Sequence, residues 1–97
     1  MSDFDEAQRG QMAQSVLDNA VYADSYALIE GGLTRAWRDS RDPSEREEIH
    51  QKLLMLDKVK NLLESVMRTG QLAEDKIRQQ KSQAERMADA AWKRKAQ

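Results

Sequence analysis

The chain has 97 residues, of which 34% are charged and 5% are aromatic, and its formal net charge is −1. A chain of this length is one domain at most and can bury only a small core. The absence of cysteine excludes disulfides, cysteine-based zinc sites and a thiol nucleophile, and one Pro with four Gly is too few for the many turns of an all-β fold.

The sequence carries neither a membrane-spanning pattern nor a secretory signal. No run of 18 apolar residues occurs, so we expect no transmembrane helix and no membrane partner. The first residues include Asp3, Asp5 and Glu6 and lack the basic-then-apolar order of a signal peptide. We therefore expect a soluble, cytoplasmic protein.

The first predicted helix covers residues 3–18. Ser2 is a candidate N-cap, and the acidic residues that follow it favour the positive end of a helix. The apolar positions are only roughly periodic, and Gly10 lowers the helix propensity. Asp18 and Asn19 compete with a helix for backbone hydrogen bonds, so a break at residues 17–20 and a continuous helix are both compatible with the sequence.

The second predicted helix carries one apolar stripe at spacings of 4, 3, 4 and 4 residues. The stripe consists of Tyr22, Tyr26, Ile29, Leu33 and Trp37. Gly31 and Gly32 interrupt it and cost roughly 2 kcal/mol of helix propensity relative to alanine. We expect a close helix–helix approach or a kink there, with a backbone ligand site as the alternative. The pair does not match a phosphate-binding loop.

A turn at residues 39–43 leads into the best-defined predicted helix, residues 43–69. Asp42 is a good N-cap, and Pro43 fits the first helical position. The apolar stripe of this helix comprises Ile49, Leu53, Leu56, Val59, Leu63 and Val66, widened by Leu54, Met55 and Leu62. Because a short turn joins it to the preceding stripe, the two helices should form an antiparallel hairpin with Trp37 near the turn. Gly70 is a candidate left-handed C-cap that ends the helix.

Residues 71–97 form a predicted C-terminal helical arm beside a core domain of residues 1–70. The core domain holds 9 Lys or Arg and 13 Asp or Glu, a balance of −4, and the arm holds 7 and 4, a balance of +3. The apolar stripe of the arm is too thin to fold alone, so the arm either projects as a solvated helix or docks on another chain. Its candidate partner-binding residues are Ile77, Lys81, Met87, Trp92, Lys93, Arg94 and Lys95. The expected fold is all-α: a helical hairpin with an N-terminal helix and a long, partly projecting C-terminal helix.

The sequence contains no residue pattern typical of a catalytic, cofactor-binding or metal site. The single His50 has no evident Ser/His/Asp or paired-carboxylate arrangement, so we interpret it as a surface histidine. The acidic residues Asp42, Glu45, Glu47 and Glu48 lack the ligand spacing of a calcium loop, and capping and solvation explain them. We therefore expect no enzymatic activity, no cofactor and no metal site.

The hairpin region resembles a group of short helical proteins from the structural gene clusters of tailed phages and prophages. The resemblance covers the run YALIEGGLTRAWRDSRDPSEREEIHQKLLMLDKVKNLLESVMRTGQLAEDKI, about half of the chain. Its features are Trp37, the charged span 40–48, the Leu-rich run 53–63 and the segment Gly70-Gln71-Leu72-Ala73. It implies a virion or assembly setting, in the host cytoplasm during assembly and in the virion. Gly31-Gly32 and the basic tail at Trp92 have no counterpart in that pattern.

The leading hypothesis is a non-enzymatic phage virion or assembly protein that acts through helix–helix contacts. Its partner would be a capsid protein, a portal protein or a sister subunit, and we expect a homo-oligomer. The first alternative is a nucleic-acid-associated packaging or regulatory factor that uses the basic arm, whose binding should weaken steeply with salt. The second is a phage-encoded inhibitor that occupies a basic site on a host protein.

Overall fold

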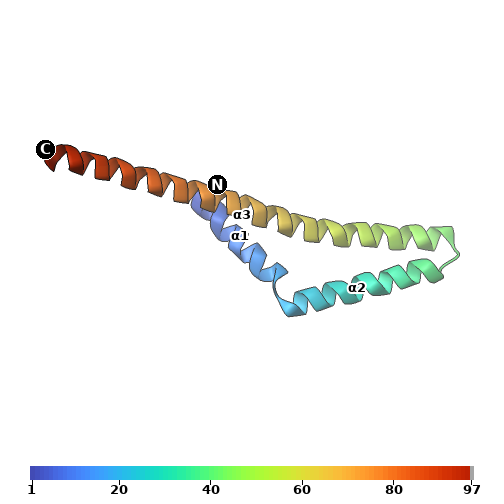
Figure 1. Ribbon diagram of the computed structural model, residues 1–97. Coiled ribbons are helices and arrows are strands. Elements are labelled where there is room, and N and C mark those ends of the chain that lie inside the picture. Colours follow the sequence, from blue (N-terminus) through green and yellow to red (C-terminus); the bar gives the residue numbers. More distant parts are fainter. Residues whose placement is uncertain (97) are drawn as a thin grey trace.

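The computed structural model describes residues 1–96, and these residues form three α-helices and no strand (Figure 1). Helix α1 runs over Asp3–Leu17, α2 over Ala20–Asp39 and α3 over Pro43–Ala96. The predicted all-α fold, with an N-terminal helix, a hairpin and a long projecting C-terminal helix, is confirmed. The last residue of the predicted arm, Gln97, lies outside the described residues.

Each helix begins at a side chain that accepts a hydrogen bond from the first turn. The Ser2 hydroxyl accepts from the Asp5 amide at 3.2 Å, and the Asn19 side chain accepts from the Tyr22 amide at 3.1 Å. At the start of α3, Asp42 Oδ1 accepts from the Ser44 amide at 3.1 Å. These bonds satisfy amides that have no partner within the helix. The question left open at residues 17–20 is thereby answered, because Asn19 caps a new helix there.

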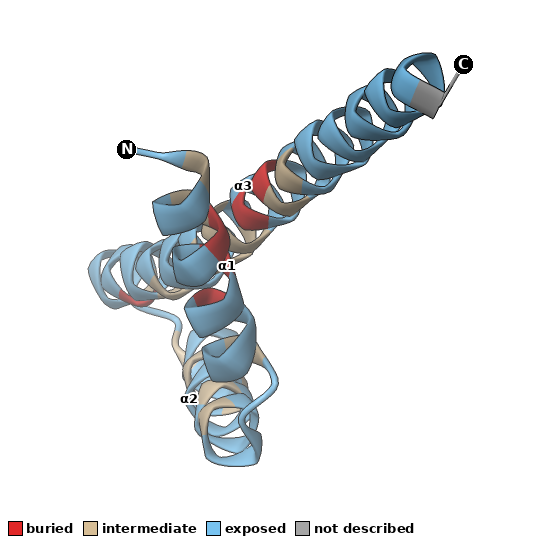
Figure 2. Ribbon diagram, turned by 90° about the vertical axis from the view of Figure 1, so that its left-hand side faces the viewer, coloured by how far each residue is buried: buried red, intermediate tan, exposed pale blue. Residues whose placement is uncertain are grey.

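The core lies where α1 crosses α3. The face of α1 toward α3 consists of Ala7, Gly10 and Ala13, and α3 contributes Gly70 and Ala73. Figure 2 shows these buried positions on both helices at the crossing. Their side chains are small, so the two backbones approach closely. The buried apolar residues are Ala7, Ala13 and Ala73 at this crossing and, 21 residues before Gly70 on α3, Ile49 in the hairpin.

Two expectations about glycine are wrong. Helix α3 continues through Gly70, which has no positive φ, because the residue serves as a contact point and not as a C-cap. A Cβ built on Gly70 would lie 2.5 Å from the Cα of Gly10, so neither position has room for a side chain. Of the two outcomes expected at Gly31-Gly32, a close approach or a kink, the close approach is absent. Helix α2 runs through both residues, and nothing lies within 4 Å of a Cβ built on either.

The hairpin of α2 and α3 is held by a few polar and aromatic contacts. The guanidinium of Arg46 lies 3.9 Å from the ring centroid of Trp37, which places Trp37 beside the turn as predicted. Further along, the Tyr26 hydroxyl donates to Asp57 Oδ1 at 2.8 Å, and Lys60 Nζ lies 5.0 Å from the centroid of the same ring. No residue of α2 is buried. The hairpin therefore buries Ile49 of α3 and no residue of α2, and the two helices diverge away from the turn (Figure 1).

The molecule is far more extended than a compact domain. Its radius of gyration is 22.8 Å and its principal extents are 83 × 23 × 18 Å. A compact domain of this length has a radius of gyration of about 13 Å. Much of the difference comes from the C-terminal part of α3, which extends past α1 with no other helix beside it (Figure 1).

Candidate functional site

The predicted partner-binding residues of the arm occupy two different environments. Ile77 is half-buried beside α1, close to the point where Gln11 Nε2 donates to Glu74 Oε1 at 3.0 Å. Every side chain from residue 78 to residue 95 is exposed, including Met87 at 68% and Trp92 at 70%. The packed part of α3 therefore extends to Ile77, seven residues beyond the division predicted at Gly70.

The exposed members of that set do not form one surface. Met87 and Trp92 are five residues apart, which separates them by about 140° around the helix. Lys81 lies on the same side as Trp92. The basic end is partly neutralised, because Lys93 Nζ lies 3.3 Å from Asp89 Oδ2. The arm is therefore a helix that is solvated on all sides and carries several separate contact points.

A feature that the sequence interpretation missed is an apolar groove between α1 and α3, with a volume of about 420 Å³. It is lined by Arg9, Met12, Ala13 and Val16 from α1 and by Val59, Leu62, Leu63 and Val66 from α3. Leu62 is 67% exposed and Met12 is 63% exposed. Seven of the eight side chains are apolar, and Arg9 is the only charged one. Exposed apolar patches of this kind mark interaction sites.

The signal for this groove was present in the spacing of α3. The groove residues Val59, Leu62 and Val66, with Met55 just outside the groove, follow one another at intervals of 4, 3 and 4 residues, which keeps them on one face of the helix. In the sequence interpretation this row was merged with the stripe that packs on α2. The crossing of α1 cannot be read from spacing, so nothing indicated that the row would remain open.

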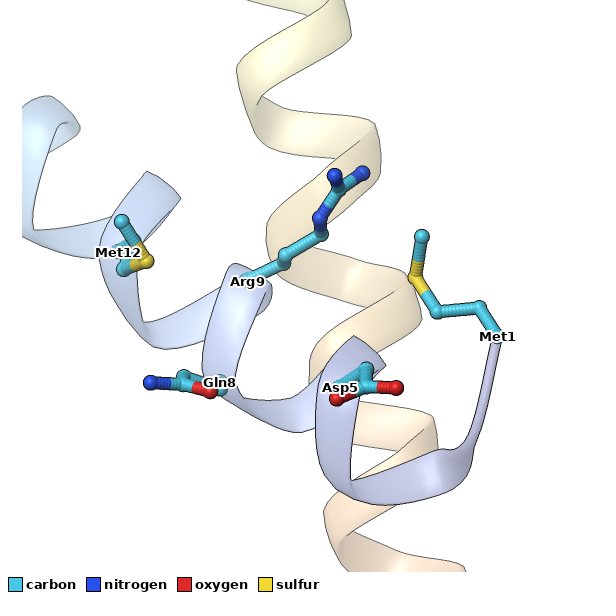
Figure 3. Close-up of a pocket in the computed structure, with 5 residues that line it drawn as sticks. All are labelled: Met1, Asp5, Gln8, Arg9 and Met12. Carbon is cyan, nitrogen blue, oxygen red and sulfur yellow. The ribbon is translucent and has the colours of Figure 1, made fainter.

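Two polar surface pockets within residues 1–96 show no arrangement suited to catalysis. One, of about 370 Å³, lies on the outer face of α1 and is lined by Met1, Asp5, Gln8, Arg9 and Met12. The polar ends of Asp5, Gln8 and Arg9 point in different directions (Figure 3). His50 lies in a shallow pocket at the turn, with Trp37 and Glu47 among its neighbours, and no hydrogen bond joins it to a carboxylate within residues 1–96.

The only perturbed titratable group resolved in the described part of the chain belongs to the hairpin. Partial burial and the hydrogen bond to Asp57 raise the pKa of Tyr26 above its usual range. The neutral phenol donates to the carboxylate, and ionisation would place two negative charges side by side. This contact orders the hairpin and touches no cavity that could hold a substrate.

Residues 1–96 contain no metal-binding cluster and no membrane-spanning helix. No group of three His, Asp or Glu side chains in that range is arranged to hold a metal ion. None of the helices described there is both long enough and apolar enough to cross a bilayer. The features that remain are the apolar groove and the solvated arm.

The fold and these two surfaces define an elongated all-α protein with exposed helical contact surfaces. Comparison with protein-family models, with curated proteins and with solved structures finds no match for this chain.

Proposed function

We propose that this chain is a non-enzymatic protein that works through helix–helix contacts with other protein chains, as a component of a tailed-phage virion or of its assembly. The large exposed surface supports the first part of this proposal, which is that the chain works through contacts with other protein chains. The accessible area is 8019 Å², whereas a folded monomer of 11.2 kDa has about 5,700 Å². Roughly 2,300 Å² more than expected is left uncovered, which favours a protein completed by partners.

The arm is the part proposed to dock on a protein of the particle, such as a capsid or portal protein. Helices in proteins owe most of their stability to packing, and this stretch of α3 packs on nothing in the described structure beyond Ile77. Exposed Met87 and Trp92 supply apolar and aromatic area of the kind that anchors interfaces. Because the two side chains lie about 140° apart, a partner that buries both would surround the arm, and it would also fix the helix.

The phage setting rests on the sequence resemblance and is tested separately. The gene would be deleted from the phage or prophage that carries it, and the yield of infectious particles would be measured. Loss of particles, with rescue by the unaltered gene and recovery of the chain from particles or assembly intermediates by mass spectrometry, is the expected result. Normal particles that lack the chain would overturn the setting.

The role of the arm is tested by rescue with single substitutions in the full-length chain. Met87→Asp places a charge on an exposed apolar position and should prevent rescue, while Ser82→Asp makes the same charge change about 140° away on the arm and should leave rescue intact. Circular dichroism checks that both variants stay helical. Full rescue by Met87→Asp and by Trp92→Ala would refute the docking role.

A nucleic-acid role for the arm is the second candidate, favoured by the basic last turn of Lys93, Arg94 and Lys95 beside exposed Trp92. Fluorescence anisotropy with labelled DNA at 50 and 200 mM salt distinguishes the two. Binding that falls steeply with salt and is lost with Arg94→Ala would support the nucleic-acid role. No binding at either salt concentration would exclude it.

A further inference from the structure

We infer that the apolar groove between α1 and α3 binds the same groove of a second copy of this chain, with the two α3 helices antiparallel. The contact is independent of the arm and goes beyond the proposed docking function. It assigns a partner to the apolar groove, which lies outside the arm. The pair would be a closed dimer in which both copies use an identical patch.

The spacing of an apolar row on α3, which supplies three of the groove's lining residues and continues past the groove to Met55, makes the row self-complementary. Met55, Val59, Leu62 and Val66 follow at intervals of 4, 3 and 4, a pattern that reads the same in both directions. In an antiparallel pair, Met55 therefore lies opposite Val66 of the other copy, and Val59 lies opposite Leu62. Each pairing occurs twice, and the two-fold axis passes between residues 60 and 61. Intervals of 4 and 3 residues are those of helices that pack along a seam.

The crossing of α1 leaves space for this arrangement. Helix α1 is fixed at Gly70, toward the C-terminal side of the row, and contributes Met12 and Val16 to the wall of the groove. A partner helix in the groove would contact α1 and α3 together, as the third helix of a bundle does. Side chains that are half to two-thirds exposed in one copy, such as Val59 at 50% and Leu62 at 67%, would become buried.

The area of the molecule is consistent with a second copy as the occupant. The uncovered excess of roughly 2,300 Å² exceeds the 800 Å² or so that each partner buries in a standard interface. One dimer contact can therefore be formed while the arm stays free. The monomer core is also small, since three of its four buried apolar residues are alanines. Chains with such a core are commonly completed by oligomerisation.

The chemistry of the groove favours a chain like this one over a charged ligand. Seven of its eight lining residues are apolar and Arg9 is the single charged one, so most of its surface suits an apolar partner. At the two ends of the seam, Gln51 of one copy would lie beside Thr69 of the other, and both are exposed and uncharged.

The first test measures the mass of the full-length chain in solution. Light scattering should give about twice 11.2 kDa at concentrations of tens of micromolar. Leu62→Glu would bury two unpaired carboxylates at the axis and should weaken the dimer by at least about 100-fold. The matched control is Leu28→Glu, an equally exposed position at 75% on α2 outside the groove, which should leave the mass unchanged. A monomeric parent chain, or a dimer insensitive to Leu62→Glu, overturns the inference.

Orientation is tested by crosslinking, since the chain has no cysteine of its own. Gln51→Cys and Thr69→Cys are made singly, mixed and treated with a short bis-maleimide. Antiparallel pairing places position 51 next to position 69, whereas two copies of position 51 are roughly 28 Å apart. Crosslinks in the mixture and not in either single variant are expected. Efficient crosslinking of each variant with itself indicates parallel pairing and refutes the arrangement.

The two proposals can fail independently. Met87→Asp should leave the dimer mass unchanged, because the arm lies outside the groove. If Leu62→Glu yields a folded monomer and Met87→Asp still rescues particles, the dimer stands and the arm function falls. If the parent chain is monomeric and Met87→Asp prevents rescue, the arm function stands and the dimer falls.

Discussion

Alanine at either glycine of the α1–α3 crossing should destabilise the chain, although alanine is the better helix former. A Cβ on Gly10 would lie 2.6 Å from the Cα of Gly70 and 3.3 Å from the carbonyl oxygen of Met67. Carbon atoms in contact are ordinarily about 3.5–4.0 Å apart, so the helices would have to separate by about 1 Å. Such overpacking costs about 1–3 kcal/mol, which offsets the gain of about 1 kcal/mol in helix propensity.

The matched controls are the other two glycines. Gly31→Ala and Gly32→Ala gain the same propensity with no neighbour within 4 Å, so each should stabilise the chain by about 1 kcal/mol, or about 4–8 °C in Tm. Thermal unfolding followed by circular dichroism, at one protein concentration, gives the difference between the two pairs. That difference, about 1–3 kcal/mol, is the steric cost. If Gly10→Ala or Gly70→Ala stabilises the chain as much as Gly32→Ala, the close approach is refuted.

A double substitution sharpens the test, because Gly10 and Gly70 meet in one contact. Once the first alanine has separated the helices, the second should cost much less, so the two effects should not add. Additive costs would mean that each glycine is restricted by a different neighbour. The same thermal scans then give the steric cost of the crossing at Gly10 and at Gly70.

Three further predictions concern the ends and pairing of the helices. Arg46→Ala should lower stability by about 1–3 kcal/mol in urea unfolding, since it removes both the stacking on Trp37 and the hydrogen bond to its carbonyl oxygen at 2.7 Å; Arg46→Lys should recover only part of the loss. The parent chain should lose stability above about pH 10, and Tyr26→Phe should abolish that loss. The raised pKa of Tyr26 means that the folded state favours the neutral phenol, so the contribution of Tyr26 to stability is present below the unfolded pKa and falls as the pH rises. Asn19→Ala should cost about 1 kcal/mol of stability by removing the cap of α2, and an unchanged midpoint would contradict that role.

The parts of the fold that sequence could predict are those set by local chemistry. Several correct predictions depend only on neighbours within a few residues. They are the caps at Ser2 and Asp42, the proline at the start of α3 and the stripe that ends at Trp37. The antiparallel hairpin followed from the short turn at residues 39–43. The break at residues 17–20 stayed open because Asp18 and Asn19 allow either outcome.

The errors concern contacts between segments far apart in the sequence. A glycine near the end of an apolar stripe resembles a C-cap, and only the position of Gly10 on a different helix explains why Gly70 is helical. The paired glycines at 31 and 32 looked like the site of close approach for the same local reason. The groove was hidden because the row from Met55 to Val66 reads as core until the path of α1 is known.

The unbroken helix α3 also determines how motion at one end reaches the other. Helix α1 contacts it at Gly70, with 27 residues before that point and 26 after it. A tilt of α3 by about 10° about the crossing would displace Trp92 by roughly 6 Å and Pro43 by roughly 7 Å in the opposite direction. Because no turn intervenes to absorb the movement, a load applied to the arm would be transmitted directly to the hairpin. Helix α3 would therefore move as one rigid rod that pivots at its contact with α1.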